Sequence, residues 1–105
     1  MKIISKEEMR QCPVGTFFID NPHMKRYEIV EDIQIKTGES FGAASLITPP
    51  DYLDPFEWDW NLDEYKDDEQ FGIFTFEEVV AEMTRYLNTR IYGLVIEQLK
   101  AKELM

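Results

Sequence analysis

Apolar side chains recur along the chain in patterns that predict four β-strands. Residues 14–20 and 71–76 are rich in aromatic and β-branched residues, which are enriched in strands. Residues 26–36 alternate between apolar and polar side chains, and after the turn sequence TGES the segment 41–48 returns as a partner strand. The short connections between these segments favour antiparallel pairing.

The alternation within residues 26–36 also predicts which side chains face the core. Tyr27 and three isoleucines share one face, while Glu28, Asp32, Gln34 and Lys36 share the other. Glu31 falls on the apolar face and breaks the pattern. A β-bulge or a sheet edge at Glu31 would explain the break.

Two capping boxes predict where helices begin. Ser5 and Glu8 open a short helix that ends at about Gln11, and Thr75 and Glu78 open a long one. Behind the second box, apolar residues recur at spacings of three and four and form one stripe. The stripe consists of Val79, Val80, Met83, Leu87, Ile91, Leu94, Val95 and Leu99.

These elements predict an α+β fold in a single domain, residues 1–105. We expect an antiparallel sheet of about four strands, with a short N-terminal helix and a long C-terminal helix packed on one face. The Pro49–Pro50 pair cannot continue a strand and opens an acidic, aromatic-rich insert at about residues 49–70.

Composition supports a globular cytoplasmic protein. Hydrophobic residues make up 44% of the chain and charged residues 30%, which argues against whole-chain disorder. Cys12 is the only cysteine and has no partner for an intramolecular disulfide, as is common in a reducing compartment. The first ten residues lack the apolar core of a signal peptide. No apolar stretch approaches the roughly 20 residues that span a membrane.

The negative charge is concentrated in one segment. The formal net charge is −10, and residues 51–69 alone hold nine acids and one lysine, a local charge of −8. Phosphates would be repelled by this segment, so direct binding to nucleic acid or to an anionic membrane is disfavoured.

A calcium loop fits this segment only in part. Asp59, Asn61 and Asp63 occupy positions 1, 3 and 5 of such a loop. Position 6 should be glycine and is Glu64, and position 12 should be a bidentate glutamate and is Gln70. We therefore expect no metal site and no cofactor.

Catalysis is not expected either. His23 is the only histidine and lies in a predicted turn, so the chain offers no recognisable set of nucleophile, base and orienting group. A single histidine and a single cysteine also exclude the common zinc ligand sets. No glycine-rich phosphate loop is present.

The aromatic residues of the acidic segment allow two interpretations. Trp58 and Trp60 are two positions apart, so in an extended chain their side chains point the same way. In the first interpretation the rings fold back and cap the sheet, because tryptophan is highly buried on average. In the second, exposed rings anchor a partner while the carboxylates steer and orient it.

The run WDWNLDEYKDDEQ resembles the acidic surfaces of DNA-mimic proteins, the class of small phage inhibitors that includes many anti-CRISPR proteins. Carboxylates at this density are comparable with phosphates, which repeat about every 3.4 Å along one strand. The resemblance implies a non-catalytic inhibitor that occludes the nucleic-acid-binding surface of a basic partner protein, such as a nuclease component, in a bacterial cytoplasm. The predicted partner-binding residues are Asp54, Glu57, Trp58, Asp59, Trp60, Asp63, Glu64, Tyr65, Asp67, Asp68 and Glu69.

Two other functions remain open at this point. An immunity protein that neutralises a cognate basic nuclease toxin would use the same physics, and a neighbouring toxin gene would favour it. A plain interaction domain could instead form a homodimer through the C-terminal helix, whose stripe Tyr86 and Tyr92 extend. A mass that depends on concentration would favour the homodimer.

Overall fold

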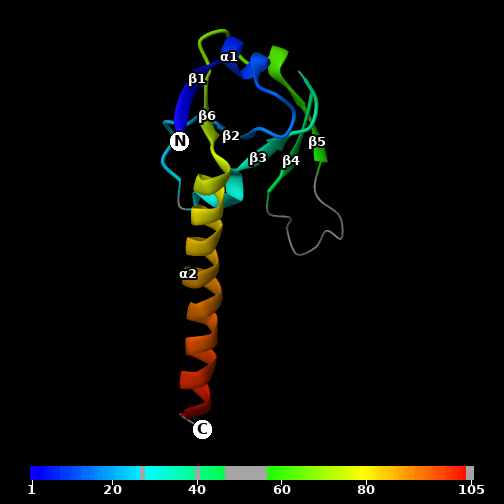
Figure 1. Cartoon of the computed structure of the whole chain (residues 1–105). Coiled ribbons are helices and arrows are strands. Elements are labelled where there is room, and N and C mark those ends of the chain that lie inside the picture. Colours follow the sequence, from blue (N-terminus) through cyan, green and yellow to red (C-terminus); the bar gives the residue numbers. More distant parts are fainter. Residues whose placement is uncertain (27, 40, 47–56, 104–105) are drawn as a thin grey trace.

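The computed structural model describes residues 1–26, 28–39, 41–46 and 57–103, without the side chains of residues 57–59, 90–96 and 102–103. The described residues form six strands, two α-helices and two short 3-10 helices (Figure 1). In chain order these are β1 (Lys2–Ser5), α1 (Lys6–Gln11), β2 (Phe17–Asp20), η1 (Ile29–Asp32), β3 (Gln34–Lys36), β4 (Phe41–Ser45), β5 (Glu57–Asn61), η2 (Leu62–Glu64), β6 (Gln70–Phe74) and α2 (Phe76–Glu103).

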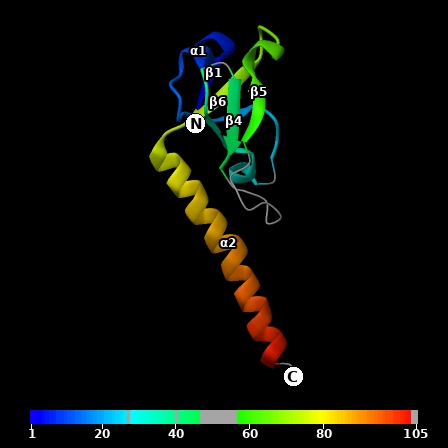
Figure 2. The same ribbon diagram turned by 90° about the vertical axis from the view of Figure 1, so that its right-hand side faces the viewer.

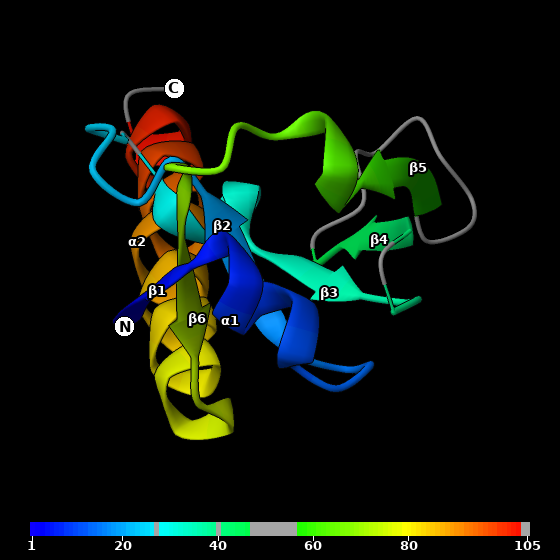
Figure 3. The ribbon, with the colours of Figure 1, turned by 90° about the horizontal axis from the view of Figure 1, so that it is seen from above.

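All six strands join one antiparallel sheet in the order β1-β6-β2-β3-β4-β5, which Figure 3 shows from above. The α+β class and the antiparallel pairing are confirmed, but the sheet has six strands instead of about four. Sequence reasoning missed β1, which directly precedes a helix signal, and β5, which lies inside the predicted insert. In β5 the sequence EWDWN does alternate, but its charge suggested a loop.

The β4–β5 pairing contains an irregularity at Gly42. The register shifts between Phe41 and Ala43, and Gly42 has a φ of 91°. A Cβ at this position would lie 2.5 Å from Thr37 Oγ1. Only glycine adopts this conformation without strain, and such bulges bend and twist a sheet.

The predicted strand over residues 26–36 is wrong in its first half. Ile29–Asp32 form η1, and only Gln34–Lys36 belong to a strand. The break in alternation at Glu31 therefore marks a 3-10 turn. Gln34 and Lys36, expected on the polar face, are buried.

One face of the sheet is covered by α1 and by the β5–η2 segment. Phe18 of β2 and Phe71 of β6 pack there against Trp60, Leu62 and other apolar residues. The buried cluster on this face consists of Ile4, Met9, Phe18, Ala43, Trp60, Leu62 and Phe71. Its members come from both edges of the sheet.

The opposite face is covered by η1 and by the first turns of α2. Ile19 and Phe74 extend from this face because strand residues alternate between faces. Val30, Ile33 and Val79 close over them, and Met83 and Tyr86 are packed at the margin. Salt bridges from Arg85 to Glu28, and from the N-terminal amine to Glu78, add to this contact.

Beyond these first turns α2 projects away from the sheet (Figures 1 and 2). The molecule is elongated, with extents of 58 × 27 × 22 Å. The prediction that the long helix packs on one face is therefore correct only for its start. Leu87 and Leu99 of the predicted stripe are 47% and 53% exposed.

Candidate protein-binding surface

Seven of the predicted partner-binding residues lie in the last part of β5 and in the segment that leads to β6. They are Trp60, Asp63, Glu64, Tyr65, Asp67, Asp68 and Glu69. Asp54 lies outside the described residues, and the side chains of Glu57, Trp58 and Asp59 on β5 are likewise not described. We call residues 62–69, which connect β5 to β6, the acidic turn.

Trp60 is a core residue and not a contact residue. Its side chain is fully buried, and its ring centroid lies 4.9 Å from that of Phe18 and 6.3 Å from that of Phe71. The prediction that Trp60 contacts a partner is therefore contradicted by its burial. Of the two interpretations, capping of the sheet applies to this tryptophan, because the face beneath it holds two aromatic rings.

Tyr65 fixes the acidic turn to the core. Its ring packs edge-on against Phe71 at 5.1 Å. The Trp60 indole Nε1–H donates to Tyr65 Oη at 3.2 Å, and the Tyr65 hydroxyl donates to Asp20 Oδ2 at 3.1 Å. Burial, reinforced by the nearby Asp20 carboxylate, raises the pKa of Tyr65 to about 12. The hydroxyl therefore stays protonated and continues to donate at physiological pH.

Arg26 extends this network on the other side of Asp20. The Arg26 side chain is only 6% exposed, lies 3.6 Å from Asp20 Oδ1 and donates to Asp32 Oδ2 at 2.8 Å. It also donates to the backbone carbonyls of Asp20 and Asn21. The Arg26 guanidinium is therefore paired with carboxylates and hydrogen-bonded to backbone carbonyls. A buried charge is tolerated under this condition.

The backbone of the acidic turn is ordered by local hydrogen bonds. Asn61 caps η2, with its side-chain oxygen accepting from the Asp63 amide at 3.0 Å. The Tyr65 amide donates to the Leu62 carbonyl at 3.2 Å, and the Glu69 amide donates to the Lys66 carbonyl at 3.1 Å. The carboxylates are thus presented from a fixed backbone.

Two basic residues of α1 neutralise part of the charge. Arg10 donates to Asp63 at 2.7 Å, and Lys6 donates to the Tyr65 carbonyl at 2.7 Å and lies 3.4 Å from Asp67. The acidic turn holds five acids and Lys66, a charge of −4. Counting the two α1 cations reduces it to −2, so the local field is weaker than the sequence suggested.

The exposed carboxylates of the turn belong to Asp63, Glu64, Asp67 and Asp68, and Glu69 is partly exposed. Asp67 remains fully exposed despite the nearby lysine. Salt bridges of this exposed kind contribute little to stability. These carboxylates therefore remain available to a basic partner.

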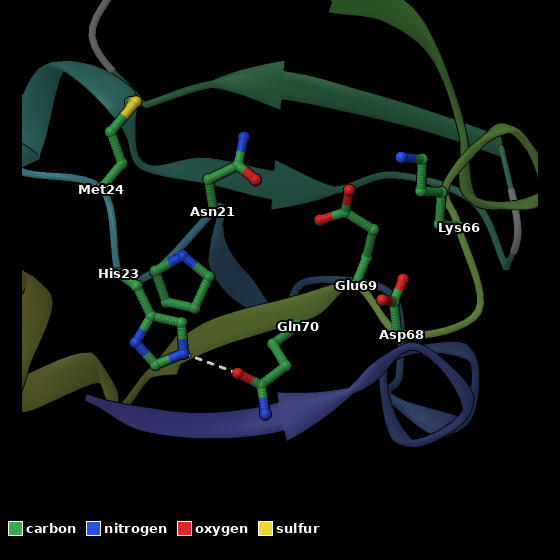
Figure 4. A pocket seen from close by; sticks show the side chains of 8 residues that line it. Asn21, His23, Met24, Lys66, Asp68, Glu69 and Gln70 are labelled. Carbon is green, nitrogen blue, oxygen red and sulfur yellow. Dashed lines mark hydrogen bonds between the residues drawn. The ribbon is translucent and has the colours of Figure 1, made fainter.

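A polar pocket of about 410 Å³ lies beside the acidic turn (Figure 4). Its lining joins the Asn21–Met24 turn to Lys66, Asp68, Glu69 and Gln70. His23 Nε2 lies 2.6 Å from Gln70 Oε1, which closes one end. Among the described residues, no group of three His, Cys, Asp or Glu side chains is placed to hold a metal ion.

Lys36 is a structural residue that the sequence pattern misplaced. It is fully buried, and its ammonium donates to the carbonyls of Met9, Arg10 and Cys12 at 3.1, 3.3 and 2.6 Å. These carbonyls end α1, where a cation is favoured by the helix dipole. Burial lowers the pKa of Lys36. The contact holds in place the helix that carries Lys6 and Arg10.

Comparison with known proteins gives no match to a family model, to a curated protein or to a solved structure. Within the part of the chain that the structure describes, no helix combines the length and apolarity needed to cross a membrane.

Proposed function

We propose that the protein is a non-catalytic binding protein whose acidic turn docks on a basic surface of a partner protein. The observation that carries the proposal is that hydrogen bonds hold the backbone of the acidic turn in place. Exposed carboxylates stand on a backbone fixed by Tyr65, by the Asn61 cap and by Lys6. Such preorganisation lowers the entropic cost of binding. A cluster of negatively charged carboxylates also accelerates the encounter with a positively charged surface.

The finer proposal is a DNA-mimic inhibitor that acts in the cytoplasm. Carboxylates would take the place of phosphates in a groove of lysines and arginines. Because Trp60 is buried, it cannot stack in place of a base, so the electrostatic contribution carries more of the proposed affinity. The neutralisation of Asp63 by Arg10 concentrates that role on Glu64, Asp67 and Asp68.

Affinity capture from a bacterial lysate tests the proposal. The parent chain and the double variant Glu64→Lys/Asp68→Lys are immobilised in parallel. Within the described residues neither side chain forms a salt bridge, so the variant should fold normally. A control variant, Glu77→Lys/Glu97→Lys, changes the net charge equally on α2. We expect a basic protein that the parent and the control retain and the acidic-turn variant loses.

Two further outcomes decide the finer proposal. If the partner uses the same groove for nucleic acid, duplex DNA should compete with the immobilised chain, and binding should weaken steeply with salt. Equal loss from both charge variants would reduce the interaction to nonspecific attraction and contradict the proposal. Release by DNA, together with identification of the partner as a toxin nuclease, would favour the immunity protein.

A further inference from the structure

A second, smaller pocket lies on the sheet face that carries Phe18. Gln34 of β3 pairs with Phe18 of β2 and with Ser45 of β4, and paired residues share one face. Asp20 lies two residues after Phe18 and therefore points to the same face. Gln34, Ser45 and Asp20 line the pocket, whose volume is about 270 Å³. It adjoins the polar pocket beside the acidic turn, because Met24 lines both.

The Gln34 side chain brings an unsatisfied acceptor to this pocket. It is only 9% exposed, and its Oε1 has no hydrogen-bond partner within the part of the chain that the structure describes. Such atoms are rare in native proteins, because a buried acceptor without a donor costs free energy. A hydrogen-bond donor bound in the pocket would remove that cost.

The charges around the pocket favour a donor that is a cation. The lining holds one cation, Arg26, and three carboxylates, those of Asp20, Glu31 and Asp32, a formal charge of −2. Arg85, which lies near η1, adds no excess of positive charge, because it is itself paired with two glutamates. The three carboxylates are not placed to hold a metal ion together, since no such group of three occurs among the described residues. An ammonium or a guanidinium group suits the pocket better.

The walls of the pocket are held in place by hydrogen bonds within the chain. Arg26 donates to the carbonyls of Asp20 and Met24, which fixes the turn between them. The Tyr65 hydroxyl donates to Asp20 Oδ2. A carboxylate has about four acceptor sites, so Asp20 and Asp32 can each accept from a further donor. A site fixed in this way binds at a lower entropic cost.

Size and chemistry select a single arginine side chain. Pockets that enclose a whole small molecule usually measure about 300–1,000 Å³, and this one is smaller. A guanidinium presents five N–H donors in a planar fork and is weakly hydrated, whereas an ammonium is compact and strongly hydrated. The guanidinium can therefore serve several acceptors at a lower desolvation cost. Met24, which is 54% exposed, offers an apolar contact to the aliphatic stem.

We infer that this pocket receives an arginine side chain of the basic partner, with the guanidinium donating to Gln34 Oε1 and to the carboxylates of Asp20 and Asp32. This anchor rests on the proposed function, because the arginine belongs to the partner that the acidic turn attracts. Buried arginines carry a large share of the binding energy at protein interfaces. The carboxylates of the turn steer the encounter, and the pocket holds the complex together.

Titration with N-acetyl-L-arginine amide, followed by the NMR chemical shifts of Gln34 and Ser45, tests the pocket itself. We expect saturable shifts at millimolar concentrations of this probe. The citrulline derivative has nearly the same shape but no charge and should not bind, and the lysine derivative should bind more weakly. Absence of shifts with the arginine probe, or equal shifts with the citrulline probe, overturns the inference. Tighter binding of free L-arginine than of the blocked form would indicate a small-molecule site and overturn the anchor.

Gln34→Met separates binding from stability. Because the variant removes an unsatisfied acceptor, its melting temperature should equal or exceed that of the parent. The dissociation constant of the arginine probe should rise by about tenfold or more, since hydrogen bonds to charged groups are strong. Gln98→Met, at an exposed position of α2, is the control and should change neither quantity. A lower melting temperature with an unchanged affinity for the probe would give Gln34 a purely structural role and overturn the inference.

Affinity capture separates the anchor from the proposed function. We expect Gln34→Met to retain less of the basic protein that the parent retains. Equal retention by the two would overturn the anchor and leave docking through the acidic turn intact. If the parent retains no basic protein, the proposed function fails, and the anchor fails with it. The titration with the arginine probe then still decides whether the pocket binds a guanidinium group.

Discussion

The sheet body and the projecting part of α2 differ in how far their apolar side chains are buried. Trp60 lies in the most acidic segment of the sequence and is fully buried, whereas Leu87 lies in its cleanest apolar stripe and is 47% exposed. Neighbouring charges did not prevent burial, because alternate residues of a strand face opposite sides. Periodicity did not ensure burial, because it shows which face is apolar but not what covers it.

The largest effect that this comparison predicts is that of Trp60→Ala. Removal of a large side chain from a close-packed cluster leaves a cavity and should lower the free energy of unfolding by about 3–5 kcal/mol. The change would also leave the Tyr65 hydroxyl without its indole partner. Denaturant unfolding of the purified chain measures it, with a matched truncation, Leu99→Ala on α2, expected to cost less than about 0.5 kcal/mol.

Equal losses from Trp60→Ala and Leu99→Ala would break the comparison, since α2 would then be as tightly held as the sheet. A normal melting curve for Trp60→Ala would instead return this tryptophan to the candidate contact surface.

Local signals in the sequence predicted much of the fold. Both capping boxes are present, with Glu8 accepting from the Ser5 amide and Glu78 from the Thr75 amide. Such boxes involve residues three apart, so they can be recognised without knowledge of the tertiary structure. The strand before α2 is also confirmed, because its run of aromatic and β-branched residues is a local signal. Antiparallel pairing was expected from the short connections between the predicted strands and is confirmed as well.

The interactions that hold the acidic turn could not be predicted, because they join distant parts of the chain. Tyr65 bonds to Asp20, 45 residues away, and Arg10 to Asp63, 53 residues away. Lys36 was misplaced because its strand is short, so alternation over residues 26–36 was not a reliable guide to its burial. Of the candidate site, the sequence located the carboxylates but not the cations of α1 that neutralise them.

Lys36→Met should have the second-largest effect. The thioether fills similar volume but leaves the Met9, Arg10 and Cys12 carbonyls without their donor, while relieving the cost of a buried charge. We expect a net loss of about 1–3 kcal/mol in the free energy of unfolding. Lys25→Met, at an exposed position, serves as the control in the same denaturant titration. An unchanged midpoint for Lys36→Met would mean that α1 needs no cation at its end.

Alkaline pH should act through Tyr65. Because its pKa is raised from 10 to about 12 in the folded state, the unfolded chain releases this proton first, and stability falls as pH rises from 10 to 12. A full two-unit shift corresponds to about 2.7 kcal/mol, and partial solvent access should reduce this to about 1–2 kcal/mol. Unfolding of the parent and of Tyr65→Phe is compared below pH 10 and near pH 12. The advantage of the parent should shrink across that range, whereas a constant difference would show that the hydroxyl is not held protonated.

The smallest expected effect is that of Leu87→Asp on the sheet body, and it separates the two regions most directly. Were Leu87 packed on the sheet, a buried unpaired charge would cost several kcal/mol and unfold the domain. At 47% exposure, the aspartate can reach water, and the free energy of unfolding of the monomer should change by no more than about 0.5 kcal/mol. The measurement is made at low concentration, where dimerisation adds nothing to stability. A loss comparable with that of Trp60→Ala would show that α2 folds back on the sheet in solution, and the open apolar face would then be part of the core.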